Sequence, residues 1–146
     1  MEQVVKIEIA RRRGGSSGKE SDDRYYYPFW IGTVIASMER LFVKPREIRY
    51  QVVCNAIKEE VIVLRAIPQT RVINARKDKV LSCVIPECEF TERIMKTAQK
   101  ERIDKQFMFG EPDKKSGDIR LIYIPVIKKT DGDNEYYINE LTGQVI

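Results

Sequence analysis

Hydrophobic residues along the chain fall in short runs, most of them bounded by glycine, proline, asparagine or charged residues. Residues 25–35 read Tyr-Tyr-Tyr-Pro-Phe-Trp-Ile-Gly-Thr-Val-Ile, an aromatic and β-branched composition that is typical of a strand. Pro28 cannot donate a hydrogen bond to a neighbouring strand, so it indicates an edge, a strand start or a bulge. Over 4–10 the alternation favours a strand, although a helix extending to Arg13 fits the same residues. Further strands are predicted over 50–55, 60–66, 119–127, 136–140 and 144–146, and residues 80–85 form a short apolar stretch that Pro86 closes.

Turns and exposed stretches separate these runs. Lys44-Pro45-Arg46-Glu47 predicts a turn, and the charged stretch 71–79 is expected to be exposed. Asp131-Gly132-Asp133-Asn134 predicts a tight hairpin turn. A calcium loop is the weaker interpretation of those acidic residues, because Thr142 stands where the last liganding Glu would be needed.

A helix is predicted over 87–107, because this stretch lacks proline and glycine and is rich in Glu, Lys, Arg, Gln, Met and Ala. The preceding proline and the acidic residues near the start suit the first turn of a helix. Phe90, Ile94 and Ala98 are spaced four residues apart and should form an apolar stripe that covers one face of a sheet. Two later apolar residues fall off this stripe and are expected to pack elsewhere or to follow a bend: Ile103 and Phe107.

Two segments of the chain align without gaps. Residues 54–62 read Cys-Asn-Ala-Ile-Lys-Glu-Glu-Val-Ile, and residues 138–146 read Ile-Asn-Glu-Leu-Thr-Gly-Gln-Val-Ile. Asparagine suits a turn, because its side chain can bond its own backbone. Gly143 can supply a positive φ that Glu59, at the aligned position, adopts only at a cost. Either the two halves contain related hairpin units, or two unrelated hairpins share their turn chemistry by chance.

These patterns predict an α+β fold, in which an antiparallel sheet built from two related hairpin units packs against one main helix. The hairpin units are expected over 25–67 and 87–146, within a single domain that spans 25–146. Residues 1–24 are expected to form a flexible N-terminal segment that contains a short strand at most, because the Gly-Gly-Ser-Ser-Gly stretch at 14–18 is small and polar.

The closing residues 136–146 resemble the end of a PepSY-type domain, which has a Tyr-x-Val-Asp-aliphatic/Ala-x-Thr-Gly-Glu-Val pattern. Asn139 and Gln144 stand here where an acidic residue and Glu are usual. The resemblance implies a helix, here 87–107, followed by a three-stranded antiparallel sheet, with a degenerate second copy in the first half. It also implies a mostly extracytoplasmic family that binds or regulates peptidases and has no catalytic residues.

Composition restricts the chemistry. The chain of 146 residues has a net charge of +4 at pH 7 and no histidine, which excludes a Ser-His or Cys-His nucleophile pair within it. The odd number of cysteines, Cys54, Cys83 and Cys88, argues against a disulfide scaffold, and their spacing does not match a zinc site. We therefore expect no catalytic residues, no cofactor and no metal site. The protein is expected to be soluble and cytoplasmic, or a soluble piece of a larger protein, with no membrane insertion.

Aromatic side chains in the first long run offer a candidate binding surface. Such rings can form a stacking platform for nucleic-acid bases or can line a groove for a peptide. The alternative is an ordinary strand whose alternate rings lie in the core. The candidate partner-binding residues in this run are Tyr25, Tyr27, Phe29 and Trp30.

Three consecutive arginines beside the glycine-rich stretch form a second candidate binding site, which could bind phosphate groups. The alternative is a solvated tail. The three arginines are Arg11, Arg12 and Arg13. The function predicted from the sequence is a non-catalytic binding or regulatory module that recognises a protein or peptide by strand addition at an exposed sheet edge. The alternative is a weak nucleic-acid-binding protein that uses this basic arm and the aromatic strand.

Overall fold

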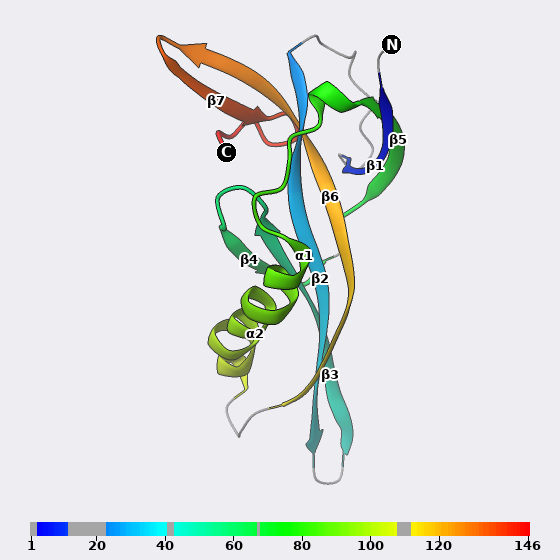
Figure 1. Ribbon diagram of the computed structural model, residues 1–146. Helices are drawn as coiled ribbons and strands as arrows, with labels where there is room; N and C mark the ends of the chain where they lie inside the picture. Colours follow the sequence, from blue (N-terminus) through cyan, green and yellow to red (C-terminus); the bar gives the residue numbers. More distant parts are fainter. Residues whose placement is uncertain (1–2, 12–22, 41–42, 67, 108–111) are drawn as a thin grey trace. The chain divides into compact units, whose positions relative to one another are not determined.

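The computed structural model describes residues 3–11, 23–40, 43–66, 68–107 and 112–146 (Figure 1). In these ranges the strands follow the hydrogen-bonded order β4-β3-β2-β6-β1-β5, and β7 pairs with β6. The α+β class predicted from the sequence is confirmed. The strands are β1 (Val4–Ala10), β2 (Arg24–Arg40), β3 (Val43–Asn55), β4 (Val61–Leu64), β5 (Thr70–Arg76), β6 (Asp113–Asp131) and β7 (Asn134–Asn139).

Two compact units share the long strands β2 and β6. Unit 1 consists of Met1–Phe29, Pro68–Cys83 and Leu121–Ile146. Unit 2 consists of Trp30–Ile67 and Val84–Arg120.

In unit 1, the first strand overturns the prediction that the sheet is purely antiparallel. β1 pairs antiparallel with β5 along its whole length, but its other side meets β6 in parallel, with Ile9 opposite Tyr123. The sheet is therefore mixed. Sequence patterns predicted hairpins, which are antiparallel by construction, whereas β1 joins strands that are distant in the sequence.

The strand at 4–10 is confirmed, and the helical alternative is wrong. Ile7 and Ile9 are buried, and they form a small core with Tyr26 and Ala75. β1 lies within the segment that we expected to precede the domain, so the folded part of unit 1 begins before residue 24. Its partner β5 lies in the charged stretch that was expected only to be exposed. The alternating pattern of β5 is weak, because it is a terminal strand with several exposed charged residues.

The hairpin between β6 and β7 follows the predicted turn. Asp131 pairs with Asn134, and Gly132 between them has a φ of 62°. In the same unit Arg24 of β2 donates to the Glu140 carboxylate at 2.7 Å, and both side chains are largely buried. This ion pair joins the start of β2 to the residue that follows β7.

Unit 2 is built around one helical segment that lies beside β3 and β4 (Figure 1). This segment begins with α1 (Glu87–Glu89) and continues through η2 (Phe90–Ile94), α2 (Met95–Ala98), η3 (Gln99–Ile103) and η4 (Asp104–Gln106). η2 and η3 are π-helical, so their turns contain more residues than an α-helical turn. Among the described residues, no helix is long and apolar enough to cross a bilayer.

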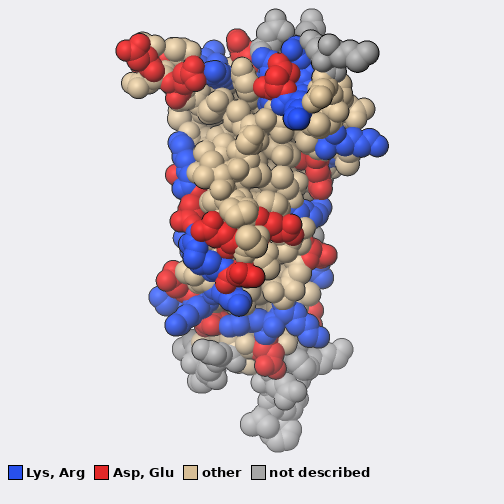
Figure 2. Space-filling view, in the orientation of Figure 1, with Lys and Arg blue, Asp and Glu red and all other residues tan. Residues whose placement is uncertain are grey.

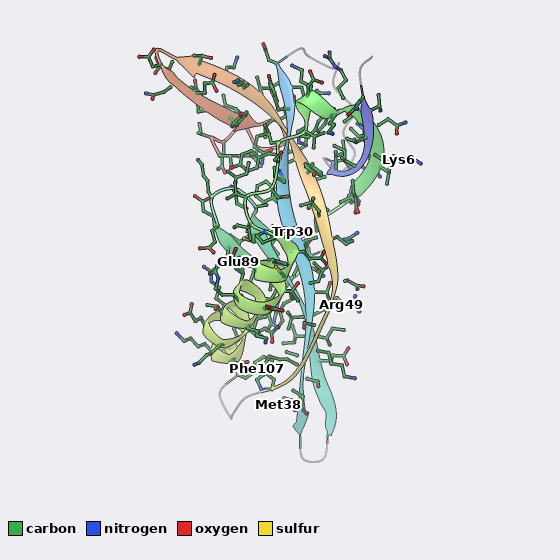
Figure 3. All side chains as sticks on the ribbon, in the orientation of Figure 1. Lys6, Trp30, Met38, Arg49, Glu89 and Phe107 are labelled. Carbon is green, nitrogen blue, oxygen red and sulfur yellow. The ribbon has the colours of Figure 1, made fainter. Side chains whose placement is uncertain are left out.

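The widened turns explain which side chains reach the core of unit 2. The predicted stripe of Phe90, Ile94 and Ala98 is buried as expected. Ile103 and Phe107 are buried in the same cluster, although α-helical spacing places them off the stripe. Each π turn delays the rotation of the helix, so residues that are four or five positions apart keep facing the sheet. Phe107 lies just past the last turn (Figure 3).

One face of the unit 2 sheet meets this helix. Alternate residues of β2 and β3 supply the contacting side chains, as the period of a strand requires. The predicted turn at 44–47 is wrong, because β3 begins at Val43 and continues through Pro45. Arg49 projects from the opposite side of β3 (Figure 3). The buried strand residues that pack on the helix are Val34, Ala36, Tyr50, Val52 and Cys54.

The turn after β3 is closed by Asn55, which is buried. Its backbone N–H donates to the Glu60 carbonyl at 2.8 Å, and the Glu59 N–H donates to the Asn55 carbonyl at 3.0 Å. The Asn55 side-chain oxygen accepts hydrogen bonds from the N–H groups of Ile57 and Lys58, at 2.9 and 3.0 Å. Glu59 has a φ of 57°, so it adopts the left-handed conformation despite its side chain.

The turn after β7 repeats this pattern. The Asn139 N–H donates to the Gln144 carbonyl at 2.8 Å, and the Gly143 N–H donates to the Asn139 carbonyl at 2.7 Å. The Asn139 side chain accepts from the Leu141 N–H at 2.8 Å. Gly143 has a φ of 75°, as its residue type predicts. The two aligned segments therefore share their local backbone hydrogen bonds.

Gly32 of β2 lies directly under the helix, and we expect Gly32→Ala to destabilise the protein by roughly 1–3 kcal/mol. A Cβ at this position would lie 2.5 Å from Met95 Sδ and 2.9 Å from Ile119 Cδ1. Met95 is fully buried, so it has little room to move. Urea denaturation measures the change. Gly117→Ala is the control, because a Cβ there meets nothing within 4 Å, and equal midpoints for both variants would contradict the expectation.

Candidate functional site

The alternation of β2 divides the predicted aromatic site residues between its two faces. Tyr25, Tyr27 and Phe29 share one face, where the Tyr27 and Phe29 ring centroids are 5.5 Å apart. Tyr137 of β7 contacts the same group, with centroid distances of 6.1 Å to Tyr25 and 5.8 Å to Tyr27. Sequence reasoning missed Tyr137, because only the pairing of distant strands brings it here.

The alternation of β2 directs Trp30, the first residue of unit 2, to the other face of the strand, and Figure 3 shows it near the helix. Its Nε1–H donates to the Ile85 carbonyl at 2.7 Å. Its ring stacks on Phe90 with a centroid distance of 6.1 Å. These contacts place Trp30 at the edge of the helix core, apart from the face that carries Tyr25, Tyr27 and Phe29.

The predicted basic arm is described only at its start. Arg11 is exposed and its backbone N–H donates to the Gln69 carbonyl at 2.9 Å. Arg12 and Arg13 lie outside the described residues. Other cations reach the aromatic run instead, since Lys79 Nζ and Lys128 Nζ lie 4.5 and 5.5 Å from the Tyr25 ring centroid.

Two of the three cysteines, Cys54 and Cys83, are poor candidates for a reactive thiolate. Burial raises the pKa of the Cys54 thiol to about 11, and the positive charge of Arg93 offsets only part of this rise. Burial also raises the pKa of the half-buried Cys83 thiol. A thiol with a raised pKa stays protonated near neutral pH and is a weak nucleophile. Within the described ranges, no three Cys, Asp or Glu side chains gather closely enough to hold a metal ion.

A groove of about 240 Å³ lies between β4 and the helix of unit 2. The helix presents Thr97 and Ala98 to it, and these short side chains leave space beside the strand. Arginine and glutamate side chains surround this space, and Figure 2 shows both charge types next to each other over the helix. The lining residues are Glu59, Val61, Arg93, Ile94, Thr97, Ala98, Glu101 and Arg102. We call this feature the β4 groove.

β4 is the terminal strand on its side of the hydrogen-bonded order. Asn55 and Glu60 form a hydrogen-bonded pair at the turn. Because such pairs alternate along an antiparallel ladder, Ile62 and Leu64 direct their N–H and C=O groups toward β3. Val61 and Val63 therefore direct theirs outward, away from β3, and Val61 also lines the β4 groove.

One of these outward groups is bound by a side chain from the helix. Arg102 Nη1 donates to the Val61 carbonyl at 2.7 Å. The Val61 carbonyl therefore accepts from Arg102 the kind of hydrogen bond that the N–H of a neighbouring strand would otherwise donate to it. On the other face of β4, the side chains of Ile62 and Leu64 are 50% and 41% exposed, so an added strand could bury them.

The two arginines of the β4 groove differ in their partners. Arg93 forms ion pairs with Glu59 and with Glu89, the latter at 2.7 Å. Arg102 lines the groove but forms no ion pair with any described residue, and its bond to the Val61 carbonyl uses only one of its five guanidinium donors. Sequence reasoning missed this site, because residues 59–61 and 93–102 meet only in the folded chain.

No protein-family model, curated protein or solved structure matches this chain. The resemblance of residues 136–146 to PepSY-type domains therefore stays a prediction.

Proposed function

We propose that this protein is a non-catalytic module that binds an extended peptide segment of a partner protein by strand addition to β4. The observation that carries the proposal is the outward edge of β4, which has no strand beside it among the described residues and which borders the β4 groove at Val61. A peptide in the groove would pair with Val61 and Val63 through its main chain. Its alternate side chains would contact the helix on one face, and Ile62 and Leu64 on the other.

The side chains of β4 favour it over β5, the terminal strand of unit 1. β4 consists only of Val and Ile and Leu residues, whereas β5 carries exposed Arg71 and Arg76. Charged side chains on an edge strand discourage pairing with another chain. β4 also has the helix as a wall, so a peptide there would gain side-chain contacts in addition to backbone hydrogen bonds.

The energetics indicate that these side-chain contacts must supply most of the affinity. Each backbone hydrogen bond to the peptide replaces hydrogen bonds to water, so it contributes only about 0.5–1.5 kcal/mol net. A four-residue strand offers few such bonds. Apolar burial adds roughly 25 cal/mol per Å², so apolar peptide positions above Ile62 and Leu64 would strengthen binding. The affinity of a peptide would then depend on the residue type at every second position of its sequence.

Blocking the edge tests the proposal. A displayed library of random short peptides is selected on the wild-type protein, and the binders are measured against Val63→Pro. We expect their affinity to fall at least about tenfold, because proline removes the outward N–H of Val63 and its ring obstructs the edge. N-methylation of the peptide at successive positions should weaken binding at every second residue, since only alternate N–H groups face β4.

Val72→Pro in β5 is the matched control. Gln3 and Lys77 form a hydrogen-bonded pair, so Val72, at an alternate position, also directs its N–H outward. This variant should bind the peptides as wild type does. Loss of binding in Val72→Pro and not in Val63→Pro would move the site to β5, and failure to select any peptide would overturn the proposal. Thermal melts check that both variants are folded.

The shared hydrogen bonds of the two turns support a related proposal, that the segments ending β3 and β7 are copies of one hairpin unit. Each turn places asparagine first and a left-handed residue four positions later. This unit is the part of the chain that resembles PepSY-type domains. The free cysteines in turn suit a reducing compartment, so we also propose a cytoplasmic location.

A further inference from the structure

Arg102 stands where an added strand must bind. Its guanidinium donates to the Val61 carbonyl, which is one of the outward groups of β4. A peptide N–H that pairs with Val61 has to take this acceptor. Arg102 would then leave the carbonyl, and its planar guanidinium would need other acceptors beside the bound peptide.

The charges around Arg102 indicate which acceptor it would take. Arg93 already has two carboxylate partners, whereas Arg102 has none among the described residues. A carboxylate accepts two parallel hydrogen bonds from guanidinium, a geometry that lysine cannot provide. Glu59 and Glu101 also line the groove, and each would repel a peptide carboxylate placed near it, so an acidic residue is favoured only beside Arg102. The preference is therefore for one acidic residue at a defined place.

We propose that Arg102 is the specificity-determining residue of the β4 groove, which selects peptides with an Asp or Glu beside Val61. This inference rests on the proposed peptide binding. Arg102 closes the edge by holding the Val61 carbonyl. When the peptide N–H replaces it there, Arg102 turns to the peptide carboxylate. Peptides without that carboxylate would displace Arg102 and gain no ion pair in return.

The experiment uses a peptide from the selected pool whose binding is lost in Val63→Pro. It is synthesised with Glu or Gln at each position in turn, and each pair is measured against wild type, Arg102→Gln, Arg102→Lys and Lys100→Gln. At one position, wild type should favour Glu about fivefold, which corresponds to ~1 kcal/mol at 25 °C. Arg102→Gln should abolish this ratio, and Arg102→Lys should restore part of it.

Lys100→Gln is the matched control, because it removes the same charge from an exposed position on the same helix outside the groove lining. It should keep the Glu preference of wild type. The preference should also decrease with added salt. If peptides bind at β4 but no position shows a Glu preference that depends on Arg102, this inference is overturned while the proposed function stands. If no Val63→Pro-sensitive peptide is found, both are overturned.

Discussion

Phe90→Ala should lower the free energy of unfolding by about 3–5 kcal/mol, the usual cost of truncating a buried phenylalanine. Phe90 is fully buried at the start of the helix and stacks on Trp30. Truncation leaves a cavity under η2, and the Trp30 ring loses its partner. Because Trp30 is the only tryptophan in the chain, its fluorescence should change in the folded state as well. Urea denaturation followed by fluorescence and by circular dichroism measures both effects.

Glu92→Ala is the control for Phe90→Ala. Glu92 is exposed on the same π-helical turn, so its truncation should change stability by less than about 0.5 kcal/mol. If Phe90→Ala and Glu92→Ala had the same denaturation midpoint, burial of Phe90 would not contribute to the stability of unit 2. A fluorescence change in both variants would point instead to a general loosening of the helix.

Asn55→Ala should cost about 2–3 kcal/mol, because it removes a buried side-chain acceptor that is shared by two backbone N–H groups of a partly buried turn. The N–H groups of Ile57 and Lys58 would lose their partner, and the short side chain of alanine would leave a gap. The loss of stability should arise in unit 2, because this turn connects β3 to β4. Thermal and urea denaturation of the purified variant measure it.

Asn139→Ala is the matched comparison in unit 1. Its side chain accepts from one N–H group, that of Leu141, and the residue is only half-buried. The same substitution should therefore cost about 1 kcal/mol there. A larger loss for Asn139→Ala than for Asn55→Ala would contradict this account, which attributes the cost to burial and to the number of bonded N–H groups.

Local chemistry in the sequence predicted several elements correctly. The aromatic and β-branched composition predicted β2, and proline-free helix formers predicted the helical segment. The Asp-Gly-Asp-Asn stretch predicted the β6–β7 turn. β5 was missed, because only Ile73 and Ala75 of its seven residues turn toward a core. The parallel contact of β1 with β6 was missed too, since no local pattern encodes which distant strands meet.

The candidate site depended on information that local patterns lack. The sequence indicated an exposed edge strand as the means of binding, but it did not indicate which strand. The β4 groove needs Val61 of a short hairpin and Thr97 of the helix to lie side by side. The aromatic residues that the sequence emphasised are explained by strand alternation, which directs Tyr27 and Trp30 to opposite faces of β2.

The two π-helical turns also restrict how this gene can change in length. Each π turn holds one residue more than an α-helical turn, so a one-residue deletion within η2 or η3 can be absorbed by a return to α-helical geometry, whereas a one-residue deletion within α2 would rotate every later helical position by about 100°. Ile103 would then leave the core, and Arg102 would no longer point at Val61. Substitutions on the exposed side of the helix have no such consequence. Related genes that keep the β4 groove should therefore differ in length, where they do, at η2 or η3 and not within α2.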